Sequence, residues 1–164
     1  MGSKNETIII AEEGKQELFI EREFDAPAEL LFRAFNEPEF LVQWLGPQDM
    51  EMEIDRYDNR SGGSYRFIHR LPNGGGEFSF NGVIHEVDEP RSIIRTFEFE
   101  GHPERGHVSL EFLTIYPLSD SRSKIHIQTI FKSVAYRDEM VQSGMESGMN
   151  EGFKKLDELL ASHL

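Results

Sequence analysis

Histidine is the residue type in this chain that is best suited to proton transfer near neutral pH. The six candidates are His69, His85, His102, His107, His126 and His163. None is spaced from another in the H-E-x-x-H manner that places two metal ligands on one face of a helix. His69 has the same strand parity as Tyr65 and Phe67, so inside a cavity it could donate a hydrogen bond or act as an acid or base. The alternative is a structural histidine whose hydrogen bonds are satisfied.

A loop near residues 101–107 gathers further polar groups, namely His102, Glu104, Arg105 and His107. Such a cluster could bind a polar head group at the mouth of a cavity. A solvated turn has the same composition and is the alternative. His126 alternates with Ile125 and Ile127, and we expect it to face water.

Other reactive motifs are missing from the sequence. No G-x-S-x-G elbow supports serine hydrolysis, and Gly74–Gly76 is not followed by the Lys-Ser or Lys-Thr of a phosphate-binding loop. The chain has no cysteine, which excludes thiol nucleophiles and disulfides. Arg66 and Arg95 could meet a ligand carboxylate if they pointed inwards, but we expect both to face outwards. We therefore assign no catalytic, cofactor-binding or metal-binding residue, predict no cofactor, and favour a protein that is not an enzyme.

Aromatic and methionine side chains are the stronger signal. They fall on expected strands and on the C-terminal helix, where they could form an apolar pocket with a few polar groups, as is typical of ligand sites. The predicted ligand-binding residues are Trp44, Tyr65, Phe67, His69, Phe78, Phe80, Phe97, Phe112, Met145, Met149 and Phe153. The alternative for each aromatic residue is that it simply fills the core.

The C-terminal segment Tyr136–Leu164 is expected to be one long helix. Its apolar face, at spacings of four, four, three and four, comes from Met145, Met149, Phe153, Leu156 and Leu160. A second stripe consists of Gly144, Gly148 and Gly152, and each glycine costs a helix about 1 kcal/mol relative to alanine. The stripe serves either close packing onto a sheet or the wall of a cavity. A membrane dimer face is excluded because the segment is too polar to span a bilayer.

The rest of the chain is expected to form a curved sheet against which this helix lies. Strands are expected near residues 18–24, 50–55, 65–69, 78–85, 93–99, 108–112 and 125–129, and Thr7–Ala11 is a further β-branched run. Two short helices follow the first strand, one with Asp25 as its N-cap and Pro27 in its first turn, the other from Pro38 to Trp44. The fold class is therefore α+β, with an antiparallel sheet of about six or seven strands wrapped around the long helix.

Length and charge limit the classes of function. The 164 residues fit a single domain spanning residues 1–164, in which we expect residues 1–6 to be flexible. The net charge of −13 argues against nucleic acid, because phosphate binding needs clustered Lys and Arg. It also argues against adsorption to anionic membranes. The segment Met1–Thr7 has no apolar signal core, so we expect a cytoplasmic protein without membrane insertion.

Several motifs, in this order and spacing, resemble those of one family. They are Arg22-Glu23-Phe24-Asp25-Ala26-Pro27, Leu41-Val42-Gln43-Trp44-Leu45-Gly46-Pro47, Gly62-Gly63-Ser64-Tyr65, Gly106-His107-Val108-Ser109-Leu110 and Gln142-Ser143-Gly144-Met145-Glu146-Ser147-Gly148. The sequence resembles the START-like (SRPBCC, helix-grip) superfamily, and more narrowly its bacterial branch related to the activator of heat-shock protein 90 ATPase. The resemblance runs from about Thr7 to Leu160.

The resemblance implies a helix-grip (START/Bet-v-1-like) fold with a deep apolar cavity between sheet and helix. Members of the superfamily bind lipids, sterols, polyketides or other hydrophobic molecules, a few are cyclases or dehydratases, one kind gives self-sacrificing resistance to a reactive natural product, and the eukaryotic namesakes bind a chaperone. Leu45 stands where many relatives have a second tryptophan, and Met149 stands where some have an aromatic residue. Both departures alter the expected cavity lining.

The leading hypothesis is therefore a binding module for a small hydrophobic or amphipathic molecule. The first alternative is a cyclase- or dehydratase-type enzyme that uses His69 or Tyr65 as acid or base. The second is an interaction domain with a chaperone as partner. Either a monomer or a homodimer agrees with the sequence.

Overall fold

The computed structural model describes residues 5–46 and 49–164, and the expectations for residues 1–4 and for Pro47 lie outside this part of the chain. Eight strands form one sheet, namely β1 (Ile8–Ile10), β2 (Glu17–Phe24), β3 (Glu51–Tyr57), β4 (Ser64–Arg70), β5 (Glu77–Asp88), β6 (Ser92–Phe99), β7 (Ser109–Ser119) and β8 (Arg122–Ile130). The helices are α1 (Ala28–Asn36), α2 (Pro38–Trp44), α3 (Val134–Gln142) and α4 (Met145–Ala161), with a short 3-10 turn η1 at Pro72–Gly74.

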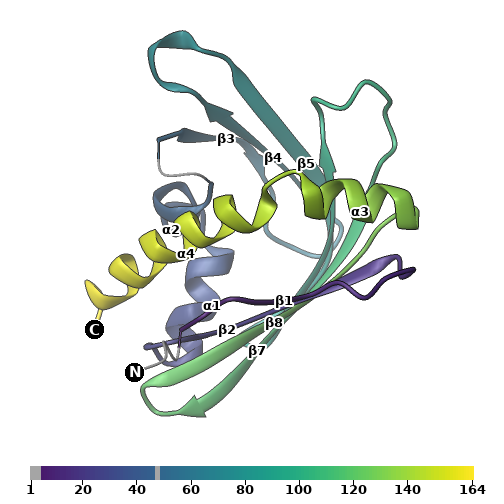
Figure 1. The fold of residues 1–164 in the computed structure, drawn as a ribbon. Coiled ribbons are helices and arrows are strands. Elements are labelled where there is room, and N and C mark those ends of the chain that lie inside the picture. The colour runs from purple at the N-terminus through teal and green to yellow at the C-terminus, as the bar shows by residue number, and fades with distance from the viewer. Residues whose placement is uncertain (1–4, 47–48) are drawn as a thin grey trace.

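The sheet is antiparallel throughout, and its strand order is β1-β2-β8-β7-β6-β5-β4-β3. It curves around α4, which lies across its concave side, while α1 and α2 lie at one end of the molecule (Figure 1). The register shifts within β3, between Ile54 and Arg56, and within β5, between Ile84 and Glu86. Such bulges bend strands, and they help the long hairpin β4–β5 to follow the curve. The predicted α+β helix-grip fold is confirmed.

Two details of the prediction were wrong. The sheet has eight strands instead of six or seven, because Ile8–Ile10 pairs with β2 as a three-residue edge strand that is too short to show alternation. The two short helices accordingly follow the second strand. The C-terminal segment is two helices, because Gly144 adopts a left-handed conformation at φ 88° and interrupts the backbone pattern between α3 and α4.

The N-cap expected of Asp25 is also absent. Pro27 occupies the cap position of α1 without a side-chain hydrogen bond. Asp25 instead accepts hydrogen bonds from Asn5 and Arg122, and Arg122 also pairs with Glu23 at 2.7 Å. The carboxylate of Asp25 therefore ties the start of α1 to the β7–β8 turn.

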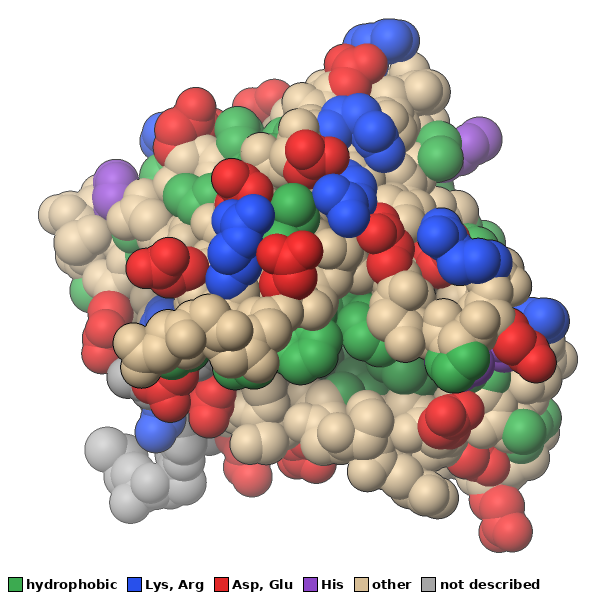
Figure 2. Space-filling view, turned by 90° about the horizontal axis from the view of Figure 1, so that it is seen from above, with side chains coloured by type: hydrophobic (Ala, Val, Ile, Leu, Met, Phe, Trp, Pro, Cys, Tyr) green, Lys and Arg blue, Asp and Glu red, His purple; other side chains and the backbone are tan. Residues whose placement is uncertain are grey.

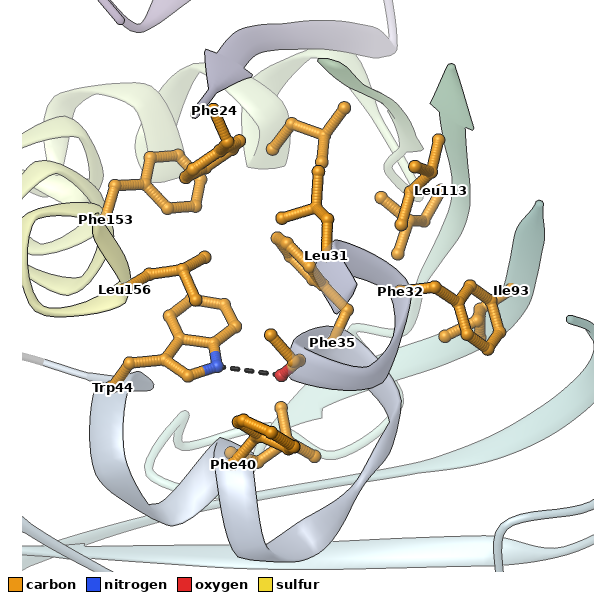
Figure 3. Packing of buried hydrophobic residues seen from close by; sticks show 14 of the residues in the cluster. Phe24, Leu31, Phe32, Phe35, Phe40, Trp44, Ile93, Leu113, Phe153 and Leu156 are labelled. Carbon is orange, nitrogen blue, oxygen red and sulfur yellow. Dashed lines mark hydrogen bonds between the residues drawn. The ribbon is translucent and has the colours of Figure 1, made fainter. Parts of the chain in front are cut away.

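The core lies between α1, α2, α4 and the sheet, and Figure 3 shows its aromatic centre. Phe24 and Phe153 meet edge to face with ring centroids 5.6 Å apart, which joins β2 to α4. Leu31 and Leu156 are fully buried in the same cluster. Leu31 lies on the buried face of α1, and Phe153 and Leu156 lie on the buried face of α4, at the spacing of amphipathic helices.

Arg22 is the exception on the buried face of β2. Its side chain is 6% exposed, and its guanidinium makes two hydrogen bonds to the Asp157 carboxylate on α4, at 2.8 and 2.7 Å. The guanidinium carbon also lies 4.6 Å from the centre of the Phe24 ring. The paired charge makes burial of Arg22 tolerable and fixes α4 to the sheet.

Candidate functional site

A cavity of about 380 Å³ lies between the sheet and α4. Its lining is mostly apolar and comes from α1, α2, β4 to β8 and α4. From above, the surface is hollowed near the middle of the view, and hydrophobic side chains are visible inside the hollow (Figure 2). Ten of the eleven predicted ligand-binding residues line the cavity, namely Trp44, Tyr65, Phe67, His69, Phe78, Phe80, Phe97, Met145, Met149 and Phe153. Their part in binding stays a prediction.

The strand aromatics form one continuous group on the concave face. Phe80 stacks on Phe97 with ring centroids 5.0 Å apart and an interplanar angle of 27°. His69 meets the Phe80 ring edge to face at 5.2 Å. Phe78 is 42% exposed, so it lies where the cavity meets solvent. Stacked and edge-on rings of this kind offer both faces and edges to a flat guest.

Phe112 is not part of the lining. The predicted alternation placed it inwards, but Leu113 and Ile115 are the buried residues of β7, and Glu111 lines the cavity. Because side chains alternate strictly along a strand, Phe112 must then face the outer side of the sheet. The prediction failed because β7 carries apolar residues on both faces, so hydrophobicity alone does not fix its orientation.

The segment after α2 shapes one wall of the cavity. The Trp44 indole N–H donates a hydrogen bond to the Ala34 carbonyl at 2.8 Å, which locks α2 onto α1 (Figure 3). Gly46 follows with φ 98°, a conformation that L side chains rarely adopt. A Cβ atom there would lie 2.6 Å from the His69 ring, so only glycine leaves room for the imidazole. The Trp-x-Gly sequence thus positions both Trp44 and His69.

His69 is 5% exposed, and its Nδ1 atom has no hydrogen-bond partner within the described residues. Burial, together with the positive charge of Lys155, lowers the pKa of His69 to about 4. The imidazole is therefore neutral at pH 7. The alternative interpretation of His69, as a structural histidine whose hydrogen bonds are satisfied, does not agree with the unpaired Nδ1 atom.

Arg95 and Glu111 were both missed as lining residues. Arg95 was expected to face outwards, but it shares the parity of Ile93 and Phe97 and lines the cavity. It pairs with Glu111 across β6 and β7, with Arg95 Nε 3.8 Å from Glu111 Oε1. Both side chains are less than a fifth exposed. The sequence signal for both residues is an arginine and a glutamate on consecutive strands, because opposite charges that face each other on neighbouring strands stabilise each other on a buried face.

Arg66, by contrast, is directed away from the lining as expected. It makes a bidentate contact with Glu100 at 2.9 Å. Hydrogen bonds from Arg66 hold the pKa of Glu100 at about 2. This pair stabilises the β4–β5–β6 region outside the cavity.

Tyr65 lies beside the Arg95–Glu111 pair. Its hydroxyl donates a hydrogen bond to the Thr96 carbonyl, and burial raises the pKa of this hydroxyl above its ordinary value. The Arg95 guanidinium carbon lies 5.1 Å from the centre of the Tyr65 ring. Gly82 makes room for the ring, because a Cβ atom at that position would come within 2.6 Å of the Tyr65 hydroxyl. A hydroxyl held in this way is poorly placed to donate its proton to a ligand.

The glycines of the C-terminal segment divide between the two predicted roles. Gly152 borders the cavity but is buried, and a Cβ atom there would lie 3.2 Å from the Trp44 carbonyl oxygen, so it allows close packing of α4 on the end of α2. Gly148 lines the cavity between Met145 and Met149. Gly144 is the break between α3 and α4. Each glycine therefore has a separate structural reason.

The histidine loop lies outside the cavity lining. The rings of His102 and His107 are 4.1 Å apart, and His107 packs on Tyr136 of α3 with centroids 4.7 Å apart. His107 Nε2 is 3.3 Å from the Glu104 carboxylate. Across residues 5–46 and 49–164, no group of three His, Asp or Glu side chains is placed to hold a metal ion.

The family model described as Activator of Hsp90 ATPase homolog 1-like protein matches residues 25–161. The chain belongs to this family. Among proteins of curated function, none matches the sequence significantly. In the described part of the chain, no helix is long and apolar enough to cross a membrane. Membership in the Activator of Hsp90 ATPase homolog 1-like family, with its START-like fold, supports a ligand-binding domain in general.

Solved structures show how widely this fold is shared. A Rhodobacter sphaeroides protein superposes with a TM-score of 0.85 at 23% identity, covering 96% of this chain and 99% of its own. An Arthrobacter aurescens protein gives 0.83 at 21% identity, with 94% and 91% covered. A protein of the same family from Silicibacter pomeroyi gives 0.73 at 23% identity, with 90% and 99% covered. At these identities the likeness concerns the fold alone.

Proposed function

We propose that this protein binds a small hydrophobic or amphipathic molecule in the cavity between its sheet and α4. The observation that carries the proposal is a hollow of about 380 Å³ whose walls are aromatic and methionine side chains. Ligand sites in proteins typically have this size and composition, with a few polar groups that orient the guest. Here those groups are His69, Arg95 and Glu111.

The methionines support a guest of adaptable shape. Met145 and Met149 lie on the helical wall, next to Gly148. Unbranched methionine side chains adjust to differently shaped partners at low cost. The wall formed by α4 can therefore adapt, while the aromatic wall formed by the sheet is held by its strand ladder.

Trp44 offers a direct test, because it is the only tryptophan of the chain and it lines the cavity. Native mass spectrometry of the purified protein should show a co-purified small molecule. Titration with fatty acids, flavonoids and polyketide-like aromatics should change Trp44 fluorescence for at least one class. No bound mass and no response to any class would contradict the proposal.

Two variants separate cavity binding from binding elsewhere. Phe80→Leu alters the cavity wall and should change the affinity of any ligand found. Phe112→Leu makes the same substitution on the opposite face of the sheet and should leave affinity unchanged. Equal effects of both variants would place the ligand outside the cavity.

A second function is favoured by one observation, the unpartnered Nδ1 of His69 on the cavity wall. A neutral imidazole with a free ring nitrogen can accept a hydrogen bond from a bound molecule, and although its lowered pKa makes it a weak base, it can take a proton from an acidic position, as a cyclase or dehydratase requires. If ligands are turned over, His69→Gln should abolish product formation detected by mass spectrometry while ligand binding persists. Product formation that survives this change would exclude His69 as the base.

A further inference from the structure

The Arg95–Glu111 pair has unused hydrogen-bonding capacity. Its closest approach, 3.8 Å from Nε to Oε1, is beyond hydrogen-bond distance. Within residues 5–46 and 49–164, no group accepts a hydrogen bond from the Arg95 guanidinium, and no group donates one to the Glu111 carboxylate. Both side chains line the cavity. A donor set and an acceptor set therefore lie side by side on an otherwise apolar wall.

Such a pair is costly unless something completes its hydrogen bonds. Charged groups away from water retain a desolvation penalty that Coulomb attraction at this distance offsets only in part. The Tyr65 ring below the guanidinium supplies a cation–π contact but no acceptor. A guest that displaces water from this wall must therefore supply hydrogen bonds to the pair through a polar group of its own.

The charges of the pair decide which polar group fits. Arg95 and Glu111 sum to zero, so the wall offers no net attraction to an ion. A carboxylate bound by Arg95 would also meet the carboxylate of Glu111, and like charges in close proximity repel. A neutral group that accepts from Arg95 and donates to Glu111 satisfies both partners at once.

We propose that the Arg95–Glu111 pair is a head-group subsite that selects flat aromatic ligands ending in a neutral group that both accepts and donates hydrogen bonds. A primary amide, or a hydroxyl beside a carbonyl, has this chemistry. The aromatic body is inferred from the stacked Phe80 and Phe97 rings next to the pair on the same wall. The inference rests on the proposed function and specifies its ligand class.

Three naphthalenes of nearly the same shape test the inference on the unaltered protein. They are 2-naphthamide, 2-naphthoate and 2-methylnaphthalene, with affinities measured at pH 7 by NMR titration. The amide should bind about tenfold more tightly than either of the others, since hydrogen bonds to charged groups exceed the neutral average. Equal affinities would overturn the head-group inference and leave the proposed cavity binding standing. No binding of any of the three would overturn this inference, and only an empty native mass spectrum as well would remove the proposed function.

Two substitutions should change which of the three naphthalenes binds most tightly. Glu111→Gln removes the negative charge beside Arg95 but keeps a side chain of similar shape. The affinity for 2-naphthoate should then exceed the affinity for 2-naphthamide. Arg95→Gln should remove the advantage of the amide over 2-methylnaphthalene. Arg91→Gln, at a side chain 73% exposed, is the matched control and should change none of the three affinities. An unchanged ranking in folded Glu111→Gln protein would contradict the role of the pair.

Discussion

The His69 imidazole is buried against Gly46 and Phe80 and carries a ring nitrogen without a partner. An unsatisfied buried polar atom costs about 1–3 kcal/mol, so this ring nitrogen lowers the stability of the fold. Its place on the cavity wall agrees with the proposed binding of a guest there.

The buried His69 side chain should make the stability of the fold depend on pH. The folded protein holds the pKa of His69 near 4, while an unfolded chain has about 6.5, so the unfolded state binds more protons between these values. Protonation of His69 therefore has no effect on stability above about pH 6.5, and it lowers the free energy of unfolding increasingly as the pH falls towards 4. Urea denaturation at pH 7 and 4.5 should show that wild type loses about 2 kcal/mol more than His69→Phe. Parallel losses in the two proteins would contradict this.

Gly82 gives a prediction about backbone space at the residue scale. A Cβ atom there would lie 2.0 Å from the Thr96 carbonyl oxygen and would also displace the Tyr65 hydroxyl. Gly82→Ala should lower the free energy of unfolding by about 1–3 kcal/mol through overpacking. Gly75→Ala is the control, because its new Cβ would make ordinary contacts at 3.5 Å. Denaturation curves that shift equally for both variants would refute the steric argument.

At the scale of the element, α4 combines a packed stretch and an open one. Both Gly148 and Gly152 line the cavity, but Gly152 also lies against the backbone of Trp44 and Gly46 at the end of α2. One helix thus closes the core at its C-terminal half and leaves room for a guest at its N-terminal half. The Gly144 break before it turns the chain from α3 into α4.

The two glycines predict opposite results for the same substitution. Gly152→Leu should destabilise the fold by about 1–3 kcal/mol, because the side chain would enter occupied space. Gly148→Leu should keep or raise stability, since removing a helical glycine gains about 1 kcal/mol, while ligand affinity falls. Urea denaturation and Trp44 fluorescence titration measure the two effects. If Gly148→Leu changed neither quantity, both interpretations of this glycine would be wrong.

Sequence reasoning succeeded where one strand face was clearly apolar. Tyr65, Phe67 and His69 alternate with polar or outward residues, and all three line the cavity. It failed for Phe112 on β7, where both faces are apolar and an acidic residue points inwards. The inward orientation of Glu111 is explained by its pairing with Arg95, and the two residues are neighbours only because β6 and β7 pair in this register. Long-range register is the information that a local pattern lacks.

The helix break escaped prediction for a similar reason. The Met and Gly repeats of the C-terminal segment continue a helical period through Gly144, so periodicity alone favours one helix. The left-handed backbone at Gly144 is selected by the path that α3 and α4 must take over the sheet. Glycine adopts positive and negative φ about equally well, so its presence alone does not predict a helix break.

At the scale of the whole molecule, the ion pair between Arg22 and Asp157 joins the sheet to the helix that covers it. Arg22 on β2 and Asp157 on α4 are far apart in sequence, and their bidentate contact crosses the core next to Phe24 and Phe153. The pair therefore holds α4 against β2 beside the contact between Phe24 and Phe153.

Breaking this pair should weaken the whole fold. Asp157→Asn leaves the buried Arg22 cation without its counter-charge, and the free energy of unfolding should fall by about 2–4 kcal/mol. Glu37→Gln removes an exposed partner of Arg33 and is the control, with a change below about 0.5 kcal/mol. Thermal unfolding of both variants measures the difference. Similar melting temperatures would show that the Arg22–Asp157 pair contributes no more than a surface contact.

The free edge of the sheet at β3 has a consequence for the protein in concentrated solution. Backbone groups along an edge strand can template the addition of a strand from another chain, which begins aggregation. Here the edge carries the exposed carboxylates of Glu51, Glu53 and Asp55, so a second copy would bring like charges into contact. Replacing the three carboxylates with amides (Glu51→Gln, Glu53→Gln and Asp55→Asn) removes this repulsion, and concentrated solutions of the variant should scatter more light than wild type.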